Sequence, residues 1–116
     1  MGEGDSLAVV GLFFGIIVYF LFSTLDLPTL LGSERRLPAI LQLVHASLAD
    51  AFWRRGRSRE RVVVEFLTVL IATQLIPVIV LAQPQTTAVV RTASVIELVL
   101  ALSWTILLVA IGARRQ

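Results

Sequence analysis

Three long apolar runs dominate the chain, and each is about the length that crosses a lipid bilayer. Residues 7–25 include no charged side chain, and a helix rising about 1.5 Å per residue would span about 29 Å over this run. The hydrocarbon core of a bilayer is about 30 Å thick. Residues 62–82 and 93–112 are each close to the ~20 residues that one crossing needs. The pattern predicts three transmembrane helices.

The second and third runs are joined by a short polar segment, residues 83–87, whose proline and glutamines favour a turn. We therefore expect two antiparallel neighbouring helices. Both runs are rich in β-branched residues, which lower helix propensity in water. Inside lipid an open strand cannot pair its backbone polar groups, whereas a helix pairs them within itself. Helices are therefore expected in spite of the local propensity.

A fourth apolar pattern lies between the first two runs, in residues 37–53. The segment is too short, and too polar on one side, to cross a bilayer. Pro38 suits a first helical turn, where its missing N–H costs nothing. We predict an amphipathic helix that lies flat on the cytoplasmic surface of the membrane. Its apolar arc holds Leu37, Ile40, Leu41, Val44, Leu48 and Phe52, opposite Gln42, Ala46 and Asp50, and Leu43 is the exception.

The arginines predict how the three spans are oriented. Cytoplasmic loops of membrane proteins carry an excess of basic residues. Only Arg91 lies in the loop between the second and third spans. We predict that the N-terminus is outside and the C-terminus is in the cytoplasm. The remaining arginines, all on the predicted cytoplasmic side, are Arg35, Arg36, Arg54, Arg55, Arg57, Arg59, Arg61, Arg114 and Arg115.

Composition excludes several classes of protein. Of the 116 residues, 57% are hydrophobic, and the mean hydropathy is +0.88, which is more apolar than a soluble domain. We expect a single all-α membrane domain, 1–116. Cysteine is absent, which removes disulfides and thiolate chemistry. Lysine is absent too, and we attribute this to GC-rich coding in a prokaryote, whose inner, cytoplasmic membrane would hold the protein.

Few residues offer catalytic or metal-binding chemistry. His45 is the only histidine, which excludes a bis-histidine haem or a multi-histidine metal site within one chain. The sequence contains no phosphate-binding loop and no dinucleotide glycine motif. We expect no enzymatic activity, no cofactor and no metal.

Trp53 and the arginines after it form a candidate site for lipid headgroups. A tryptophan ring favours headgroup depth, and each basic residue near an anionic surface contributes about 1 kcal/mol. We expect anionic headgroups as partners. Because the orientation rule already accounts for these arginines, nucleic acid is not expected as a partner. The site is Trp53, Arg54, Arg55, Arg57 and Arg59.

Glu97 is the most informative polar residue in the predicted spans. It lies about one turn inside the outer end of the third span, where an unpaired carboxylate costs up to about 3 kcal/mol. Alignment of the two antiparallel spans places it level with Pro77, whose ring frees the carbonyl of Thr73. We expect Glu97 to bond that carbonyl or Gln74. The alternatives are a proton or cation relay, extension to water near Arg91, and a contact with another subunit.

Other residues of the spans point to helix contacts. Thr73 and Gln74 lie near the middle of the second span, where polar side chains usually face another helix. Gly11 and Gly15 form a GxxxG step, which lets a second helix approach closely. We predict that these four residues lie in contacts between helices.

Glu60-Arg61-Val62-Val63 and Glu97 resemble positions in a known family, the small three-helix F-type subunit of multisubunit cation/proton antiporters. The second helix of that subunit starts with Asp-Arg-Val-Val, and its third helix carries an acidic residue. The chain departs from the pattern because Arg57, not proline, follows Gly56, and because the first loop would need a long insertion. The chain also loosely resembles the phosphate-starvation-inducible E-type membrane proteins around Val18-Tyr19-Phe20-Leu21-Phe22 and at Trp104. Those proteins have one more span than this chain is predicted to have. We carry no residue role over.

The leading functional hypothesis is a non-catalytic accessory or structural subunit of a larger membrane complex, with other membrane subunits as partners. The GxxxG step, Gln74 and Glu97 support it, because three helices alone do not obviously satisfy them. The alternative is a homo-oligomeric ion or proton transporter or pore, including a holin-like one, with Glu97 and Gln74 lining the pathway. A lipid-active enzyme that uses the surface helix is the third possibility.

Overall fold

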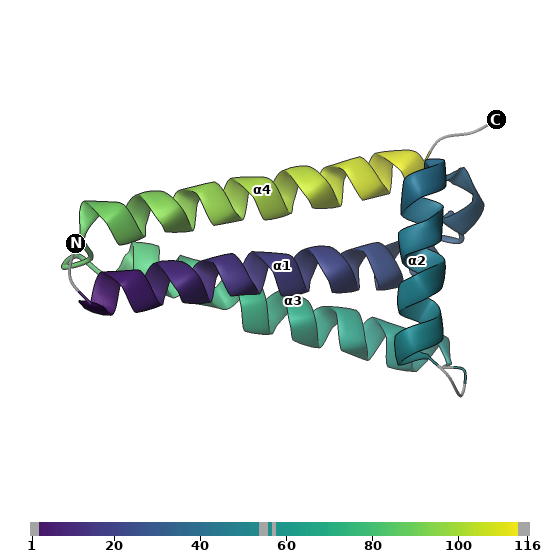
Figure 1. Ribbon diagram of the computed structural model, residues 1–116, viewed down its shortest axis with the longest axis horizontal. Coiled ribbons are helices and arrows are strands. Elements are labelled where there is room, and N and C mark those ends of the chain that lie inside the picture. Colours follow the sequence, from purple (N-terminus) through teal and green to yellow (C-terminus); the bar gives the residue numbers. More distant parts are fainter. Residues whose placement is uncertain (1–2, 54–55, 57, 114–116) are drawn as a thin grey trace.

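The computed structural model describes residues 3–53, 56 and 58–113, and the regular structure in these residues is entirely helical. Three long helices run side by side: α1 (Glu3–Leu31), α3 (Arg59–Ala82) and α4 (Ala88–Ala113). The shorter α2 (Ala39–Phe52) crosses one end of this bundle (Figure 1). The predicted all-helical fold is confirmed, with three helices long and apolar enough to span a membrane. All three helices extend beyond the predicted spans at one end or both.

Helix α1 differs most from the prediction, which ended the first span before Asp26 and Pro28. The helix continues through both residues to Leu31. Pro28 removes one amide from the helical ladder, but the Thr29 hydroxyl donates to the Leu25 carbonyl at 3.1 Å and adds a bond to the same turn. Every residue from 23 to 28 is buried. Tertiary packing therefore stabilises the helix past Pro28, although the local sequence pattern predicts that the helix ends before this residue.

A glycine ends α1. Gly32 has a φ of +65°, in the left-handed region that favours glycine. The amide of Ser33 donates to the Pro28 carbonyl at 2.9 Å, and the amide of Gly32 donates to the Thr29 carbonyl at 3.3 Å. This is the Schellman arrangement, which satisfies the last carbonyls of a helix. A 3₁₀ turn, η1 (Glu34–Arg36), then leads the chain to α2.

Helices α3 and α4 form the expected antiparallel hairpin (Figure 1). Ser58 caps the start of α3 by accepting from the Arg61 amide at 3.3 Å. The turn between the helices is held by two side chains. The Thr86 hydroxyl donates to the Val80 carbonyl at 2.9 Å, and Arg91 donates to the carbonyls of Leu81 and Gln83 at 3.3 and 3.0 Å.

Helix α1 forms the centre of the bundle, because it packs against α3 and α4 more extensively than these pack against each other. One core cluster contains Ile16, Tyr19 and Ala101. The other, nearer α2, contains Leu27, Leu37 and Leu108. In the most apolar stretch of each long helix, only 11% to 28% of the residues are buried inside the protein. The large apolar surface that remains is compatible with a multi-pass membrane protein.

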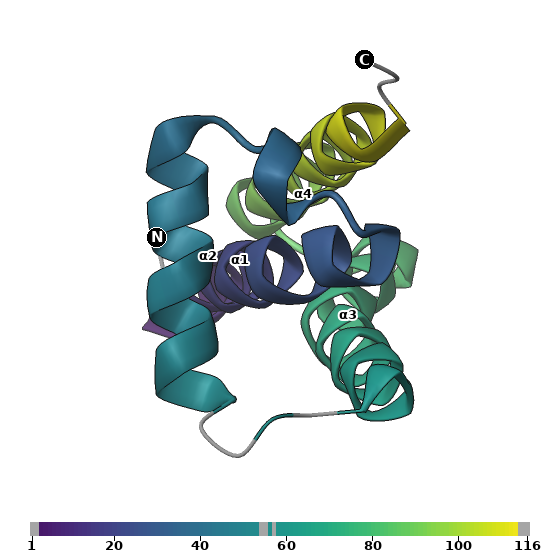
Figure 2. The same ribbon diagram turned by 90° about the vertical axis from the view of Figure 1, so that its right-hand side faces the viewer.

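Helix α2 lies beside the last turns of α1 rather than over the centre of the bundle (Figure 2). Its inner face carries His45 and Phe52. His45 Nε2 lies 3.0 Å from the Thr29 hydroxyl, and the ring of Phe52 contacts that of Phe22 at a centroid distance of 5.3 Å. Side chains of Ile40 and Leu43 are 76% and 70% exposed. The helix therefore has one face on α1, and its exposed side chains are both apolar, Ile40 and Leu43, and polar, Gln42, Ser47 and Asp50.

Two residues of the predicted amphipathic helix have other positions. Leu37 precedes α2 and is buried against Leu27 and Leu108. Gln42, expected only on the polar side, donates to the carbonyls of Leu37 and Arg35 at 2.8 and 2.9 Å. These bonds satisfy backbone groups just before the helix begins, a role that a wheel diagram does not reveal.

Candidate functional site

The polar centre of the bundle joins α3 to α4. Gln74 Nε2 donates to Glu97 Oε1 at 2.8 Å. Glu97 is 4% exposed, although it belongs to a helix whose outer surface is largely apolar. Glu97 Oε2 and Gln74 Oε1 are buried and have no hydrogen-bond partner among residues 3–53, 56 and 58–113. The pair is therefore half satisfied by the part of the chain that the structure describes.

Thr73 extends this centre along α3. Gln74 Nε2 also lies 3.2 Å from the Thr73 hydroxyl, which in turn donates to the Val69 carbonyl at 2.7 Å. Pro77, one turn further along, is fully buried. Of the two partners expected for Glu97, the freed Thr73 carbonyl and Gln74, it is Gln74 that bonds it. The amide, not the carboxyl, is the donor.

The two glycines of the GxxxG step have different surroundings. A Cβ placed on Gly15 would lie 3.9 Å from the carbonyl oxygen of Thr73, so Gly15 faces α3 within the same bundle. A Cβ on Gly11 would meet nothing within 4 Å. The step therefore supplies one contact inside the described protein and one open position on its surface.

A second polar contact, which the sequence reading missed, joins α1 to α4. The Thr105 hydroxyl donates to the Ala101 carbonyl at 2.8 Å, so it accepts a hydrogen bond from the Tyr19 hydroxyl. Tyr19 is 1% exposed and its ring contacts Phe66 at a centroid distance of 6.3 Å. A tyrosine in an uncharged apolar run was a usable signal, because a buried phenol normally finds a partner.

A shallow groove between α1 and α4 includes Glu97 in its lining. Its volume is about 180 Å³, and its walls are apolar apart from Glu97. Leu12 and Ile16 of α1 are buried in its floor, while Phe13 and Ile96 stand more than half exposed at its rim. Glu97 is therefore buried in the polar centre and is also part of the lining of a surface hollow.

Of the residues predicted to meet lipid headgroups, the structure describes Trp53 and Arg59. Trp53 is half-buried, and its ring contacts that of His45 edge to face at 6.2 Å. Arg59 donates to the Leu30 carbonyl at 2.9 Å, which ties the start of α3 to the end of α1. Arg54, Arg55 and Arg57 lie outside the described residues. Arg59 thus has a structural contact that its place in an arginine cluster did not indicate.

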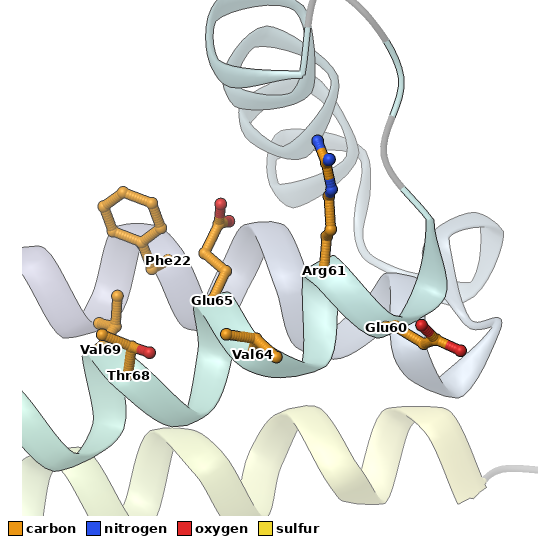
Figure 3. A pocket seen from close by; sticks show the side chains of 7 residues that line it. All are labelled: Phe22, Glu60, Arg61, Val64, Glu65, Thr68 and Val69. Atoms are coloured by element: carbon orange, nitrogen blue, oxygen red, sulfur yellow. The ribbon is translucent and has the colours of Figure 1, made fainter.

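An open hollow of about 680 Å³ lies at the same end of the bundle. Arg61 and Glu65 extend from one side of α3, near Phe22 of α1 (Figure 3). Glu60, Val64, Thr68 and Val69 complete its lining. The hollow thus combines both signs of charge with apolar walls.

Within the described residues, no group of three or more His, Asp or Glu side chains is placed to hold a metal ion. Comparisons with protein-family models, curated proteins and solved structures find no match. Function is therefore inferred from the contacts described above.

Proposed function

We propose that the protein is a non-catalytic accessory or structural subunit of a larger membrane complex, with α1, α3 and α4 crossing the bilayer. The observation that carries the proposal is the half-satisfied pair of Gln74 and Glu97. Each keeps one buried oxygen without a partner in the described chain, and polar groups at membrane depth are costly unless paired. The chain's own atoms cover both oxygens, so a neighbouring subunit would supply the missing donors by displacing the side chains that cover them.

The surface of the bundle supports the same proposal. Its long helices bury only a minor part of their apolar residues against one another. Large side chains such as Phe13, Phe14 and Leu102 are 62% to 67% exposed. Lipid covers such surfaces, and so do the helices of a partner subunit, which pack through small residues such as the exposed Gly11.

We place α2 at the cytoplasmic surface, with the α3–α4 turn outside, because the described arginines Arg35, Arg36, Arg59 and Arg61 flank α2 along the chain, whereas only Arg91 is near the turn. Arg61 borders the open hollow at this end, next to the apolar Phe22 and Val64, a combination suited to a phosphate headgroup above an acyl chain. The exposed Ile40 and Leu43 of α2 would contact lipid tails.

The orientation is tested with single cysteines, since the chain has none of its own. Gln85→Cys lies in the α3–α4 turn and Ser47→Cys on α2, and both positions are exposed. A membrane-impermeant maleimide should label Gln85→Cys in intact cells and Ser47→Cys only after the membrane is opened. The reverse pattern would overturn the orientation.

The accessory role is tested by the mass and composition of the particle solubilised from its native membrane. We expect larger membrane subunits to co-purify in a fixed ratio. A stable monomer with no companion would contradict the proposal. A particle made only of this chain would favour the homo-oligomeric pathway, which a comparison of ion flux between wild-type and Glu97→Gln proteoliposomes then tests.

A further inference from the structure

The open hollow beside α3 combines a cation, a carboxylate and apolar walls. Arg61 and Glu60 both belong to its lining, and both side chains are exposed. They leave α3 in different directions (Figure 3). Val64 and Val69 add apolar surface to the same lining. A ligand from outside the protein therefore meets both charged groups without displacing any part of the chain.

Arg61 differs from the arginines that hold the bundle together. Arg36, Arg59 and Arg91 donate to backbone carbonyls near the ends of helices. Arg61 makes no such bond to a described residue with its guanidinium, and its contact with Ser58 comes from its main-chain amide. A guanidinium is a planar fork of five N–H donors that matches the oxygens of a phosphate. A phosphate that enters the hollow is therefore a well-matched partner for Arg61.

Glu60 determines which kind of phosphate headgroup fits. It directly precedes Arg61 in α3, so a phosphate held by Arg61 lies close to a carboxylate. An anionic headgroup is repelled by that carboxylate, whereas a zwitterionic headgroup matches both charges. A primary ammonium also donates charge-assisted hydrogen bonds to a carboxylate. A quaternary ammonium has no N–H and does not.

An apolar stripe leads from the hollow toward the middle of α3. It consists of Val64, Leu67 and Ile71, which are 62%, 48% and 59% exposed and lie on one side of the helix. Phe22 of α1 borders the hollow from the neighbouring helix. The hollow, about 680 Å³, has the volume of a small-ligand site, and the stripe continues about 10 Å beyond it. A headgroup fits in the hollow, and an acyl chain fits along the stripe.

We propose that this hollow binds a phospholipid with a primary ammonium headgroup, as in phosphatidylethanolamine. Its phosphate binds Arg61, its ammonium binds Glu60, and an acyl chain follows the apolar stripe. The proposal rests on the proposed placement of the α2 end at the membrane surface, because that placement puts the hollow where headgroups meet acyl chains. It names a zwitterionic partner in addition to the anionic headgroups expected from the arginine cluster.

The first test compares headgroups on the full chain in detergent micelles. Native mass spectrometry would measure binding of phosphatidylethanolamine, phosphatidylcholine and phosphatidylglycerol with identical oleoyl chains. Phosphatidylethanolamine should bind about fivefold more tightly than phosphatidylcholine, the upper limit for one exposed ion pair. It should also bind more tightly than phosphatidylglycerol. Equal binding of the three lipids, or a preference for phosphatidylglycerol, would overturn the proposal.

The second test assigns the headgroup contacts. Glu60→Gln should abolish the preference for phosphatidylethanolamine over phosphatidylcholine, and Arg61→Gln should weaken both lipids alike. The matched controls are Asp50→Asn on α2 and Arg35→Gln on η1, which make the same charge changes at exposed positions outside the lining of the hollow. Both controls should bind the lipids as the wild type does. Equal effects in the controls and in the variants of the hollow would count against the site.

The third test separates a lipid site from a site for a soluble phosphate compound. Glycerophosphoethanolamine has the same headgroup and no acyl chain. It should fail to displace the lipid at concentrations at which a short-chain phosphatidylethanolamine succeeds, and equal displacement by both would refute the lipid assignment. Binding in micelles requires neither a partner subunit nor a fixed orientation. Co-purification and cysteine labelling therefore test the proposed function separately from this site.

Discussion

The side-chain amide of Gln74 on α3 reaches Glu97 Oε1 on α4 across 2.8 Å, and it ties together the two helices of the hairpin. Hydrogen bonds between membrane helices contribute about 0.6 kcal/mol on average and at most about 1.7 kcal/mol. We therefore expect Gln74→Leu and Glu97→Leu to be coupled. A double-mutant cycle of unfolding free energies in detergent should give a coupling in this range.

The control for this cycle pairs Gln74→Leu with Val99→Ala, because Val99 is 55% exposed on α4 and forms no part of the polar centre. That pair should be additive. A coupling near zero for Gln74 and Glu97 would mean that the bond adds nothing beyond packing.

The close approach of α4 to the end of α1 requires Gly112. A Cβ at this position would lie 2.8 Å from Cδ1 and 3.2 Å from Cβ of Leu31. Gly112→Val should therefore destabilise the protein by about 1–3 kcal/mol, the usual cost of overpacking. Gly112→Ala should cost less, because the Leu31 side chain is 42% exposed and has room to turn.

Gly11→Val is the matched control for Gly112→Val. It puts the same side chain into a long helix where a Cβ meets nothing within 4 Å. Its melting temperature in detergent should stay close to that of the wild type. Similar losses in both variants would show that helix propensity, not contact with Leu31, sets the cost.

Tyr19 combines a large packing contribution with a small polar one. Tyr19→Phe removes the hydrogen bond to Thr105 but keeps the ring contact with Phe66, so we expect a loss of about 0.5–1.5 kcal/mol. Tyr19→Ala also removes a ring from the core and should cost about 3–5 kcal/mol. Phe14→Ala, at a side chain 67% exposed, should cost much less than Tyr19→Ala in the same unfolding assay.

The contact between His45 and Thr29 fixes which ring nitrogen carries the proton. The Thr29 hydroxyl donates its single hydrogen to the Leu25 carbonyl, so it accepts from His45 Nε2. In the neutral imidazole, ¹⁵N NMR should show that Nε2 is protonated and Nδ1 is not. Thr29→Val should reduce this preference, whereas Thr68→Val, an exposed site on α3, should leave it unchanged. A wild-type spectrum with Nδ1 protonated would contradict the assigned bond.

The amino-acid pattern predicts the long helices well because their apolar runs exceed every other signal in the chain. It fails at Asp26 and Pro28, where a charge and a proline mark a local end but tertiary contacts bury both residues. It also leaves the pairing of Tyr19 with Thr105 unseen, because the two residues are 86 positions apart. Such contacts depend on how each helix turns about its axis, which a one-dimensional pattern does not specify. The alignment of Glu97 with Gln74 was accessible because a short turn fixes the offset of the two helices.

The central position of α1 has a consequence for synthesis. The ribosome makes α1 before the α3–α4 hairpin. If the three long helices cross a bilayer as proposed, the helix that contacts both later helices enters the membrane when neither exists. Ser23 and Asp26, which the finished bundle buries completely, are then without most of their eventual cover. We expect α1 to remain near the insertion machinery until the hairpin arrives, and an early release of α1 would leave these polar groups facing lipid.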